Sequence, residues 1–508
     1  MLAKTESIAL IGTDAHLIEV EVHVAAGGIP CFRIVGLPNA SVREAEQRTR
    51  AAITSKKLQW PQRRITANLA PGALRKEGTQ FDLAIALGIL AADEQVSPTR
   101  LDGHVIVGEL ALDGSVRPVR GVLAAAIACK RRLRRGLICP LANATEASLV
   151  SGIEIVPVTS LVDCLRWLAG EWEAPKIEPP VVETRPSVVD MAEVRGQGAA
   201  KEALEIAAAG GHNLLLSGPP GSGKTMLAGR LPSILPAMTQ EESLDVTRVY
   251  SVAGLLGEHA GLVSKRPFRS PHHHVSVAGL VGGGSGLPRP GEISLAHHGV
   301  LFLDELPLYR RDVLDSLRAP IEDGVVRIAR SSGVVTYPCR FSLITAMNPC
   351  PCGYAGDPMR ECKCKEQQLH AYESRLSGPL LDRIDMEVDV ERPTRAELFG
   401  TSAAEDSATV RERVERAHRL QHQRYELPLT NASAPRSLFR RRAALTPEAV
   451  DTLATVVDQT HLSGRGVDRV LRVARTIADL SSSESVERSH VKLALRFRLA
   501  AGLKGVAA

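Results

Sequence analysis

Eight consecutive residues have the types and the spacing of a loop that binds nucleotide phosphates. They read G-x-x-x-x-G-K-T and are Gly218, Pro219, Pro220, Gly221, Ser222, Gly223, Lys224 and Thr225. In such a loop the glycines let backbone N–H groups close around the β-phosphate, the lysine reaches the β- and γ-phosphates, and the threonine hydroxyl ligates Mg²⁺. The sequence therefore predicts a site for ATP and Mg²⁺.

The segments around this loop suit the strand and the helix that it needs. Residues 212–216 form a short apolar run, which predicts a buried strand, and residues 226–231 suit the start of a helix. The helix N-terminus adds a favourable dipole to the phosphate site. A chance glycine-rich turn would lack this strand–loop–helix context.

A second apolar run ends in two carboxylates. Residues 300–305 read VLFLDE, which is the Walker B pattern. Asp304 would hold Mg²⁺ through water, and Glu305 would polarise the attacking water as general base. The alternative is a buried strand with a charged end, but its position downstream of a phosphate loop favours the catalytic interpretation.

Two further segments narrow the class. Residues 341–348 form another apolar strand that ends at Asn348, which resembles sensor 1 of AAA+ ATPases and would position the water against the γ-phosphate. Residues 380–385 read LLDRID and resemble the segment that carries the arginine finger. Arg383 would then complete the ATP site of a neighbouring subunit, which requires a ring. A solvated surface charge is the alternative.

A third segment resembles the sensor 2 position of the same class. Residues 463–466 read SGRG at the start of a predicted helix, and Arg465 is the first candidate there. Arg469 and Arg472 follow at helical spacing. Here too a solvated surface charge is the alternative.

Residues 324–336 predict a hairpin just before the sensor 1 strand, because two β-rich runs flank Arg-Ser-Ser-Gly. Arg327 and Arg330 would lie on or near its tip and would grip DNA phosphates without reading sequence. Aromatic residues make up only 3% of the chain, which argues against a base-stacking platform. A solvated charged hairpin is the alternative.

Two C-x-C pairs predict a structural zinc site. Their residues are Cys350, Cys352, Cys362 and Cys364. Four thiolates in so compact a loop suit tetrahedral Zn²⁺, although four reduced cysteines in a turn remain the alternative. The chain has nine cysteines, an odd number, which fits a metal site in a reducing cytosol better than disulfides.

Three consecutive histidines at positions 272–274 allow two interpretations. They could bind a metal ion, or they could belong to a polar loop near the pore. Adjacent residues point in different directions on a regular element, so the sequence favours the polar loop.

The chain length and the composition set the larger organisation. A chain of 508 residues should hold two or three domains at roughly 100–200 residues each. The net charge of +5 does not by itself indicate a nucleic-acid binder. No apolar stretch is long enough for a membrane span, and the N-terminus lacks a signal-peptide layout. We therefore expect a cytoplasmic protein.

Composition divides the chain into four parts. Residues 1–170 alternate short apolar strands with helical patterns, and the proline-rich, charged residues 171–190 predict a linker. Residues 191–395 hold the nucleotide motifs, and residues 396–508 read as helices. The predicted fold class is α/β with a helical C-terminal part.

Several longer strings resemble the Mg-chelatase-like AAA+ family called ComM or YifB. The strings are FRIVGLP at 32–38, NLAP at 68–71, KEG at 76–78, FDL at 81–83, FRSPHH at 268–273 and ARTIADL at 474–480. The resemblance covers nearly the whole chain. It implies an N-terminal domain of the ribosomal S5 domain 2 type, like the protease domain of Lon, a central AAA+ P-loop domain and a C-terminal helical lid. It also implies a hexameric ring that moves branches of DNA during recombination in natural transformation.

The Lon likeness does not extend to protease chemistry. Lon-type proteases use a serine and a lysine, and in our alignment Gln80 and Leu123 occupy those two positions. Neither side chain can carry out acyl transfer. The N-terminal domain is thus expected to be a platform for assembly or for DNA.

Three functions remain open at this point. The favoured one is an ATP-driven motor that acts on single-stranded and branched DNA. A magnesium chelatase motor would share the AAA+ core and the helical lid, but as a family it starts at the AAA+ core and lacks the Lon-like part. A nucleotide-gated scaffold would hydrolyse ATP without any response to DNA.

Overall fold

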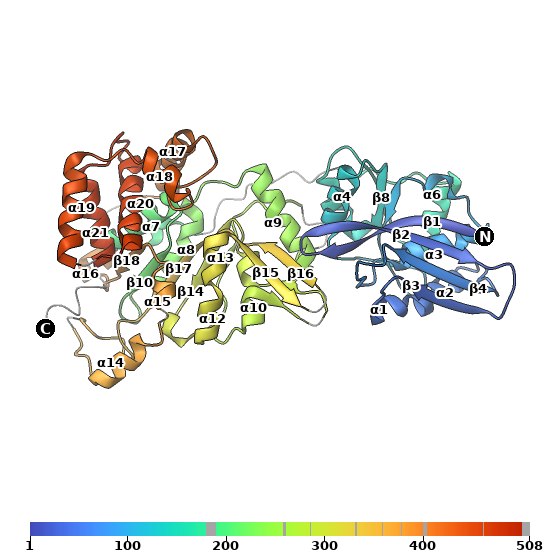
Figure 1. Ribbon diagram of the computed structural model, residues 1–508, viewed down its shortest axis with the longest axis horizontal. Coiled ribbons are helices and arrows are strands. Elements are labelled where there is room, and N and C mark those ends of the chain that lie inside the picture. Colours follow the sequence, from blue (N-terminus) through green and yellow to red (C-terminus); the bar gives the residue numbers. More distant parts are fainter. Residues whose placement is uncertain are drawn as a thin grey trace.

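The computed structural model describes residues 1–178, 189–257, 261–284, 286–330, 333–357, 359–376, 378–399, 404–460 and 462–499. Most of the predicted linker at 171–190 and the Ser-Ser pair at the tip of the predicted hairpin lie outside the described residues. The described residues form an elongated molecule with the N-terminal part at one end, the nucleotide part in the middle and the C-terminal helices at the other end (Figure 1).

The N-terminal part is built on a seven-stranded mixed sheet in the order β3-β4-β2-β1-β5-β8-β9. The strands are β1 (Leu2–Ile11), β2 (Asp14–Val24), β3 (Cys31–Val35), β4 (Arg64–Ala70), β5 (His104–Ile106), β8 (Gly136–Pro140) and β9 (Glu154–Val158), with a small ladder of β6 (Glu109–Leu110) and β7 (Val116–Arg117). The β1–β2 and β2–β4 pairs are antiparallel, and the other pairs of this sheet are parallel.

Helices cover this sheet and complete its core. They are α1 (Ala40–Arg43), α2 (Ala45–Ser55), α3 (Asp82–Ala92), α4 (Val122–Arg131), α5 (Ala144–Ser148) and α6 (Leu161–Ala169). Every residue of α3 is buried, because its sequence is apolar on all sides after the first residue. Strands such as β2 and helices such as α3 thus alternate along this part, as the sequence predicts.

The nucleotide part contains a five-stranded parallel sheet in the order β11-β14-β17-β10-β18. Its strands are β10 (Leu214–Ser217), β11 (Phe268–Arg269), β14 (Gly299–Leu303), β17 (Phe341–Met347) and β18 (Met386–Asp389). The strands are almost continuously apolar, as expected for a sheet covered on both faces. Because all five strands run the same way, the loops after them meet at one edge of the sheet.

The helices of this part are short in its second half. They are α7 (Gly198–Gly210), α8 (Lys224–Ile234), α9 (Gln240–Ala253), α10 (Val277–Val281), α11 (Glu292–Leu295), α12 (Arg311–Ser316), α13 (Arg318–Asp323), α14 (Glu366–Glu373), α15 (Gly378–Leu381) and α16 (Arg395–Phe399). Two small antiparallel ladders accompany them: β12 (Gly282–Gly283) with β13 (Arg289–Pro290), and β15 (Val325–Arg330) with β16 (Gly333–Pro338).

The C-terminal part is helical, as predicted. Its helices are α17 (Ser407–Tyr425), α18 (Arg436–Arg442), α19 (Pro447–Thr460), α20 (Gly464–Leu480) and α21 (Arg488–Leu499). α17 and α20 pack on α7, and the apolar residues of both parts form one continuous core. The lid is therefore packed directly on the nucleotide part.

The residues of the ARTIADL string at 474–480 form a buried network of ion pairs and hydrogen bonds in the lid. Arg475 is fully buried and pairs with Asp479, which also binds Arg424 of α17. Thr476 of the same string accepts a hydrogen bond from Asn431. The string thus holds α20, α17 and the turn after α17 together, because buried charges need such partners.

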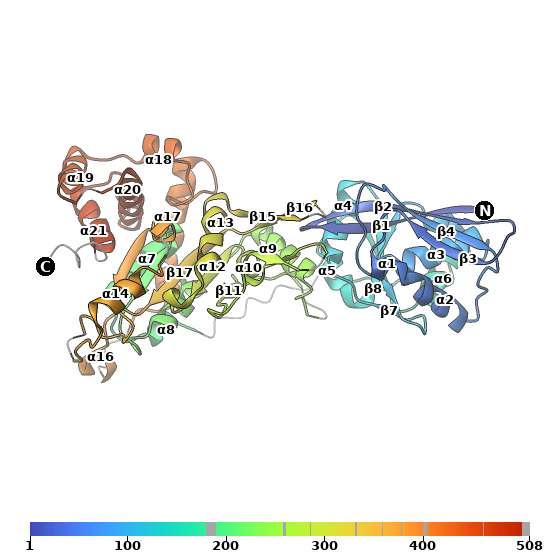
Figure 2. The same ribbon diagram turned by 60° about the horizontal axis from the view of Figure 1, so that its bottom comes forward.

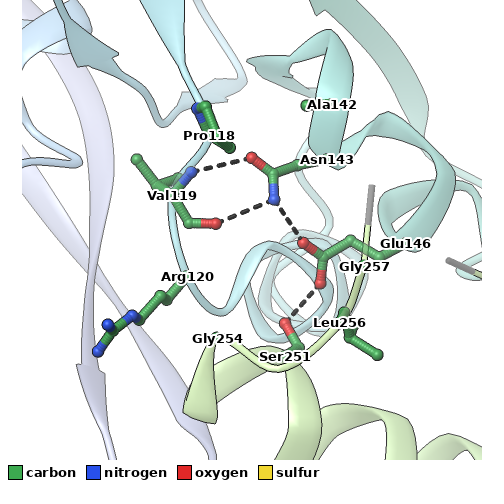
Figure 3. Close-up of a pocket in the computed structure, with 10 residues that line it drawn as sticks. All are labelled: Pro118, Val119, Arg120, Ala142, Asn143, Glu146, Ser251, Gly254, Leu256 and Gly257. Carbon is green, nitrogen blue, oxygen red and sulfur yellow. Dashed lines mark hydrogen bonds between the residues drawn. The ribbon is translucent and has the colours of Figure 1, made fainter. Parts of the chain in front are cut away.

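Helix α9 joins the nucleotide part to the N-terminal part. The Ser251 hydroxyl donates to the buried carboxyl group of Glu146, whose other oxygen accepts the Asn143 amide at 2.7 Å (Figure 3). Burial raises the pKa of Glu146 above its ordinary value. The adjoining cavity of about 230 Å³ is smaller than the roughly 300–1,000 Å³ of ligand sites, so we treat it as part of the junction.

The turn between β1 and β2 makes another contact of the junction, against the β15–β16 hairpin (Figure 2). Gly12 has a φ of 65°, and a Cβ atom there would lie 2.6 Å from the Thr336 carbonyl oxygen. Arg248 of α9 donates to the Thr13 carbonyl at 2.7 Å and pairs with Asp14. The N-terminal part therefore touches the hairpin that the sequence predicts as a DNA contact.

Candidate nucleotide site

The G-x-x-x-x-G-K-T loop connects β10 to α8 at the edge where the parallel strands end. Gly221 and Gly223 have φ angles of 78° and 94°, which side chains other than glycine rarely adopt. At Gly218 a Cβ atom would lie 2.2 Å from the Val390 carbonyl oxygen after β18. Glycine is thus required both for the turn and for the close approach of β18.

Lys224 lies at the centre of the candidate site. Its ammonium group donates to the carbonyl oxygens of Gly218 and Pro219 at 2.7 and 3.0 Å, and to the Asn348 side-chain oxygen at 3.1 Å. Burial lowers the pKa of Lys224, and the charges of Asp304 and Glu305 act in the opposite direction. The structure therefore brings the predicted sensor 1 residue to the predicted phosphate-binding lysine.

The predicted magnesium ligands also lie together. The Thr225 hydroxyl donates to the Asp304 carboxylate at 2.6 Å, which joins the first turn of α8 to the end of β14. A hydroxyl and a carboxylate side by side form an oxygen donor set that suits Mg²⁺ with a nucleotide phosphate. The residues present therefore fit ATP and Mg²⁺.

Glu305 adopts a left-handed backbone conformation with a φ of 52°, and its carboxylate is half exposed. Its side chain lies 3.7 Å from Nδ1 of His273. Partial burial and the neighbouring His272 and His274 hold the pKa of His273 below its ordinary value. Sequence reasoning missed this contact, although β11 and β14 are neighbours in the sheet and the loops after them meet.

The four predicted zinc ligands converge. The Cys350 sulfur lies 3.3 Å from the Cys352 sulfur and 3.6 Å from the Cys362 sulfur, and the ligand atoms of these three and Cys364 lie within 4.8 Å of one another. Four sulfurs around Zn²⁺ at about 2.3 Å would stand about 3.8 Å apart. The donor set therefore fits a tetrahedral ion.

The cysteine loop packs directly on the phosphate loop. Gly353 has a φ of 86°, and a Cβ atom there would lie 2.6 Å from the Pro220 ring. On the other side, the Tyr372 hydroxyl donates to the Asn348 carbonyl at 3.1 Å. A metal ion in this loop would therefore brace both the phosphate loop and Asn348.

Arg383 points back onto its own chain. Its guanidinium pairs with Glu322 at 2.6 Å and donates to the carbonyls of Pro379 and Arg318 at 2.6 and 3.1 Å. Only 11% of the side chain is exposed. A role in the ATP site of a neighbouring subunit would require this pair to open, and that role stays a prediction.

The three lid arginines have different positions. Arg465 is exposed in the first turn of α20, and no hydrogen bond or ion pair links it to the described residues of the phosphate loop. Arg472 donates to backbone carbonyls inside the lid. Arg469 alone of the three reaches the nucleotide part, where it pairs with Asp385 at 3.4 Å. Of the three candidates for the sensor 2 position, the arginine that contacts the nucleotide part is therefore Arg469, whereas the sequence favoured Arg465.

The predicted hairpin is confirmed as β15 and β16. Arg330 lies opposite Gly333 next to the turn, and Arg327 lies three residues further from it. Both side chains are exposed, and Arg327 forms a surface pair with Asp323 at 3.1 Å. The chain leaves the hairpin directly into β17, which ends beside Asn348.

The two residues that the sequence aligns with the serine and the lysine of Lon-type proteases are buried. The Gln80 amide donates to the carbonyls of Glu77 and Ile8 at 2.8 and 3.4 Å. Leu123 packs in the same apolar cluster as Ile8. Neither position supplies a nucleophile or a base.

Among the described residues, no helix has the length and the apolar character needed to cross a membrane.

Comparisons with known families match all three parts of the chain. Residues 190–398 match the family described as magnesium chelatase, subunit ChlI; residues 20–143 match subunit ChlI of Mg-chelatase; and residues 404–498 match magnesium chelatase, subunit ChlI C-terminal. Together with the parallel sheet, the assembled phosphate site and the helical lid, these matches define an Mg-chelatase-like AAA+ protein.

Individual relatives identify the family within this class of AAA+ proteins. The competence protein ComM of Haemophilus influenzae is 42% identical over 505 residues, which cover 98% of this chain and 97% of that protein. The YifB protein of Escherichia coli is 42% identical over 496 residues, 96% of each chain. A Mycobacterium tuberculosis protein described as uncharacterised is 44% identical over 499 residues, 98% of each chain. The chain belongs to the ComM/YifB family, as its motifs predicted.

Proposed function

We propose that this protein is an ATP-dependent DNA motor of the helicase or branch-migration type. It would act in homologous recombination in the cytoplasm, including recombination of transforming DNA, on single-stranded and branched DNA. The full-length similarity to a relative named as a competence protein supports this proposal. The arginines of the hairpin would hold phosphates of the DNA backbone, and shape would then select branched DNA.

One observation carries the proposal. The exposed hairpin with Arg327 and Arg330 continues into β17, and β17 ends beside Asn348, which accepts a hydrogen bond from Lys224. A rigid strand thus connects the residues that would hold DNA to the residues that would hold the γ-phosphate. A change at the phosphate can therefore displace the hairpin.

In the proposed mechanism, Lys224 and the loop amides would bind the phosphates, and Thr225 with Asp304 would hold Mg²⁺, which would neutralise phosphate charge. Glu305 accepts a proton from the attacking water, which Asn348 helps to position. A hexameric ring would bring Arg383 of a neighbouring subunit to the phosphate. Arg465 is the proposed sensor 2 residue. Through it, ATP hydrolysis would change the position of the lid relative to the nucleotide part.

The test is ATP hydrolysis with and without single-stranded and branched DNA. DNA should stimulate hydrolysis by the wild-type protein, and Glu305→Gln should abolish hydrolysis at any DNA concentration. The double variant Arg327→Ala, Arg330→Ala should lose the stimulation and keep the basal rate. Arg416→Ala, an exposed arginine on α17, is the matched control.

An ATPase rate indifferent to DNA would contradict the motor. It would favour the second candidate, the motor of a magnesium chelatase, which the three family matches support, or a nucleotide-gated scaffold.

For the N-terminal part we propose a platform of the ribosomal S5 domain 2 type, related to the Lon protease domain but without its chemistry. The buried Gln80 and Leu123 support this. Casein cleavage by purified protein, abolished by a change in residues 1–170, would contradict it.

A further inference from the structure

The loop after β11 gathers three imidazole rings beside Glu305. The ring centres of His272 and His273 lie 4.1 Å apart, those of His273 and His274 4.4 Å, and those of His272 and His274 5.1 Å. One ring nitrogen of each lies within 4.8 Å of the others. Adjacent side chains diverge on regular elements, but these residues form a turn, where their rings can converge.

Contacts on both sides hold this turn in place. Before it, Arg269 makes two hydrogen bonds to Glu292, at 2.6 and 2.8 Å. The buried Tyr309 donates its hydroxyl to the Pro271 carbonyl at 2.6 Å. After it, the Val275 N–H donates to the His272 carbonyl at 2.8 Å. The three rings are therefore gathered by the fold around them.

The carboxylate of Glu305 completes the arrangement. Nδ1 of His273 lies 3.7 Å from Glu305, which leaves Nε2 free to bind a metal ion. Histidines that bind metals commonly turn their other ring nitrogen toward a carboxylate. We propose that His272, His273 and His274 bind one late first-row divalent cation, such as Ni²⁺, Co²⁺ or Zn²⁺. Imidazole ligands suit these ions, whereas Mg²⁺ prefers oxygen.

This site would regulate ATP hydrolysis, a consequence that rests on the proposed function. A metal ion on His273 makes its Nδ1–H a stronger hydrogen-bond donor toward Glu305. The carboxylate would then be drawn from its present distance of 3.7 Å into a hydrogen bond with the imidazole and be less available to the attacking water. Binding of the ion should therefore inhibit hydrolysis of Mg²⁺-ATP.

Metal binding is tested first, on full-length protein whose cysteines have been saturated with Zn²⁺. Equilibrium dialysis against Co²⁺ at micromolar concentrations should show one added ion, and its visible spectrum should lack sulfur-to-cobalt bands. The double variant His272→Gln, His274→Gln should lose this ion. The double variant His16→Gln, His23→Gln is the matched control, because both residues are exposed on β2.

Hydrolysis of Mg²⁺-ATP with and without Ni²⁺ is the second measurement, with each variant compared to its own rate without Ni²⁺. We expect inhibition of the wild type and of the β2 control, and no inhibition of the His272→Gln, His274→Gln variant. Absence of the added Co²⁺, or equal binding by that variant, would overturn the site. Co²⁺ binding by a protein that hydrolyses no ATP would leave the site standing and contradict the proposed function.

Discussion

At the scale of single residues, the site depends on side chains that come from different strand ends. Lys224 follows β10, Asp304 follows β14 and Asn348 follows β17, and hydrogen bonds join Lys224 to Asn348 and Thr225 to Asp304. Because the carboxyl ends of parallel strands share one edge, residues 79 and 124 positions apart meet there. The same geometry brings His273 to Glu305.

His297 provides a prediction about pH. It is buried before β14, its Nδ1 accepts the Arg340 N–H at 3.0 Å, and burial, together with His298 and Arg340, lowers its pKa to about 3. The folded state therefore binds fewer protons than the unfolded state, and stability is lost as pH falls below the ordinary value of 6.5. Between pH 6.5 and 5 this loss is about 2 kcal/mol at 1.36 kcal/mol per pKa unit.

His297→Asn keeps an acceptor for the Arg340 N–H but does not titrate. Urea unfolding at pH 6.5 and pH 5 should show a smaller loss of stability for this variant than for the wild type. His16→Asn, which changes an exposed histidine, should leave the loss unchanged. An equal loss in wild type and His297→Asn would contradict the prediction.

At the scale of elements, one segment packs on the phosphate loop and two others are connected to it through strands of the sheet. The cysteine loop packs on Pro220, the β15–β16 hairpin leads through β17 to Asn348, and α20 of the lid reaches Asp385 at the start of β18. Each contact gives a distant element a mechanical connection to the site.

The cysteine loop should matter through its metal ion. Cys352→Ser, or removal of metal by a chelator, should release Zn²⁺ and loosen Asn348 and the phosphate loop. A displacement of about 1 Å in an active site can lower the rate about a hundredfold, so we expect a loss of roughly tenfold to a hundredfold in ATP hydrolysis. Metal analysis together with ATPase rates checks this.

Cys31→Ser is the control for the zinc prediction, because Cys31 is exposed on β3 and far from the cluster in sequence. Its metal content and its rate should match the wild type. Less than one Zn²⁺ per chain in protein purified without chelators would contradict the zinc site.

Arg469 should connect the lid to the core. It pairs with Asp385, which also accepts the Asn213 N–H at 3.0 Å at the start of the strand that leads to the phosphate loop. Burial acts to raise the pKa of Asp385, but His212 and Arg469 hold it below its ordinary value. Arg469→Ala leaves a buried carboxylate without its cation, which should cost about 1–3 kcal/mol of folding free energy.

The matched control is Arg465→Ala in the same helix, because this exposed side chain should contribute within about 0.5 kcal/mol to stability. If Arg465 is sensor 2, its variant should lower hydrolysis without changing stability, whereas Arg469→Ala should lower both. Chemical denaturation and ATPase rates separate the two roles. Equal stability of both variants would argue against the Arg469 connection.

At the scale of the whole molecule, the described residues show several contacts between the N-terminal part and the nucleotide part, among them Glu77, which accepts the Leu287 N–H at 2.8 Å. The buried pair of Glu146 and Ser251 joins α5 to α9, and the β1–β2 turn lies against β16 (Figure 2). Movement of the β15–β16 hairpin would therefore displace the β1–β2 turn of the N-terminal part. The proposed ring would add coupling between subunits to this coupling within one chain, because Arg383 would act on the ATP site of a neighbouring subunit.

Subunit mixing tests the ring. Arg383→Ala should lower ATP turnover by about 10³, as loss of an arginine finger does, and Lys224→Ala should abolish it. A mixture of the two should regain activity, because an Arg383→Ala subunit offers an intact phosphate loop to a neighbour with an intact Arg383. ATPase rates across mixing ratios measure this.

The control mixture combines Lys224→Ala with Glu305→Gln. Both changes damage the site of their own subunit, so no mixture of the two should regain activity. If Arg383 only stabilised its own chain through Glu322, the Arg383→Ala mixture would also stay inactive, and the ring prediction would fail.

The family, the α/β class of the fold and the residues that meet at the candidate nucleotide site were predictable from the sequence. Their signals are local: the glycine spacing before Lys224, the apolar run before Asp304, the two C-x-C pairs and the β-rich runs around Arg330. Each depends on residues a few positions apart, where backbone geometry alone limits the structures that can form.

Only the tertiary structure decided which of these residues meet. It paired Arg469 rather than Arg465 with the core, turned Arg383 onto Glu322 and gathered three histidines beside Glu305. These outcomes depend on the packing of elements that are distant in the chain. Helical spacing places several arginines on one face of α20, but the partner that lies opposite each one is set by the position of the neighbouring sheet.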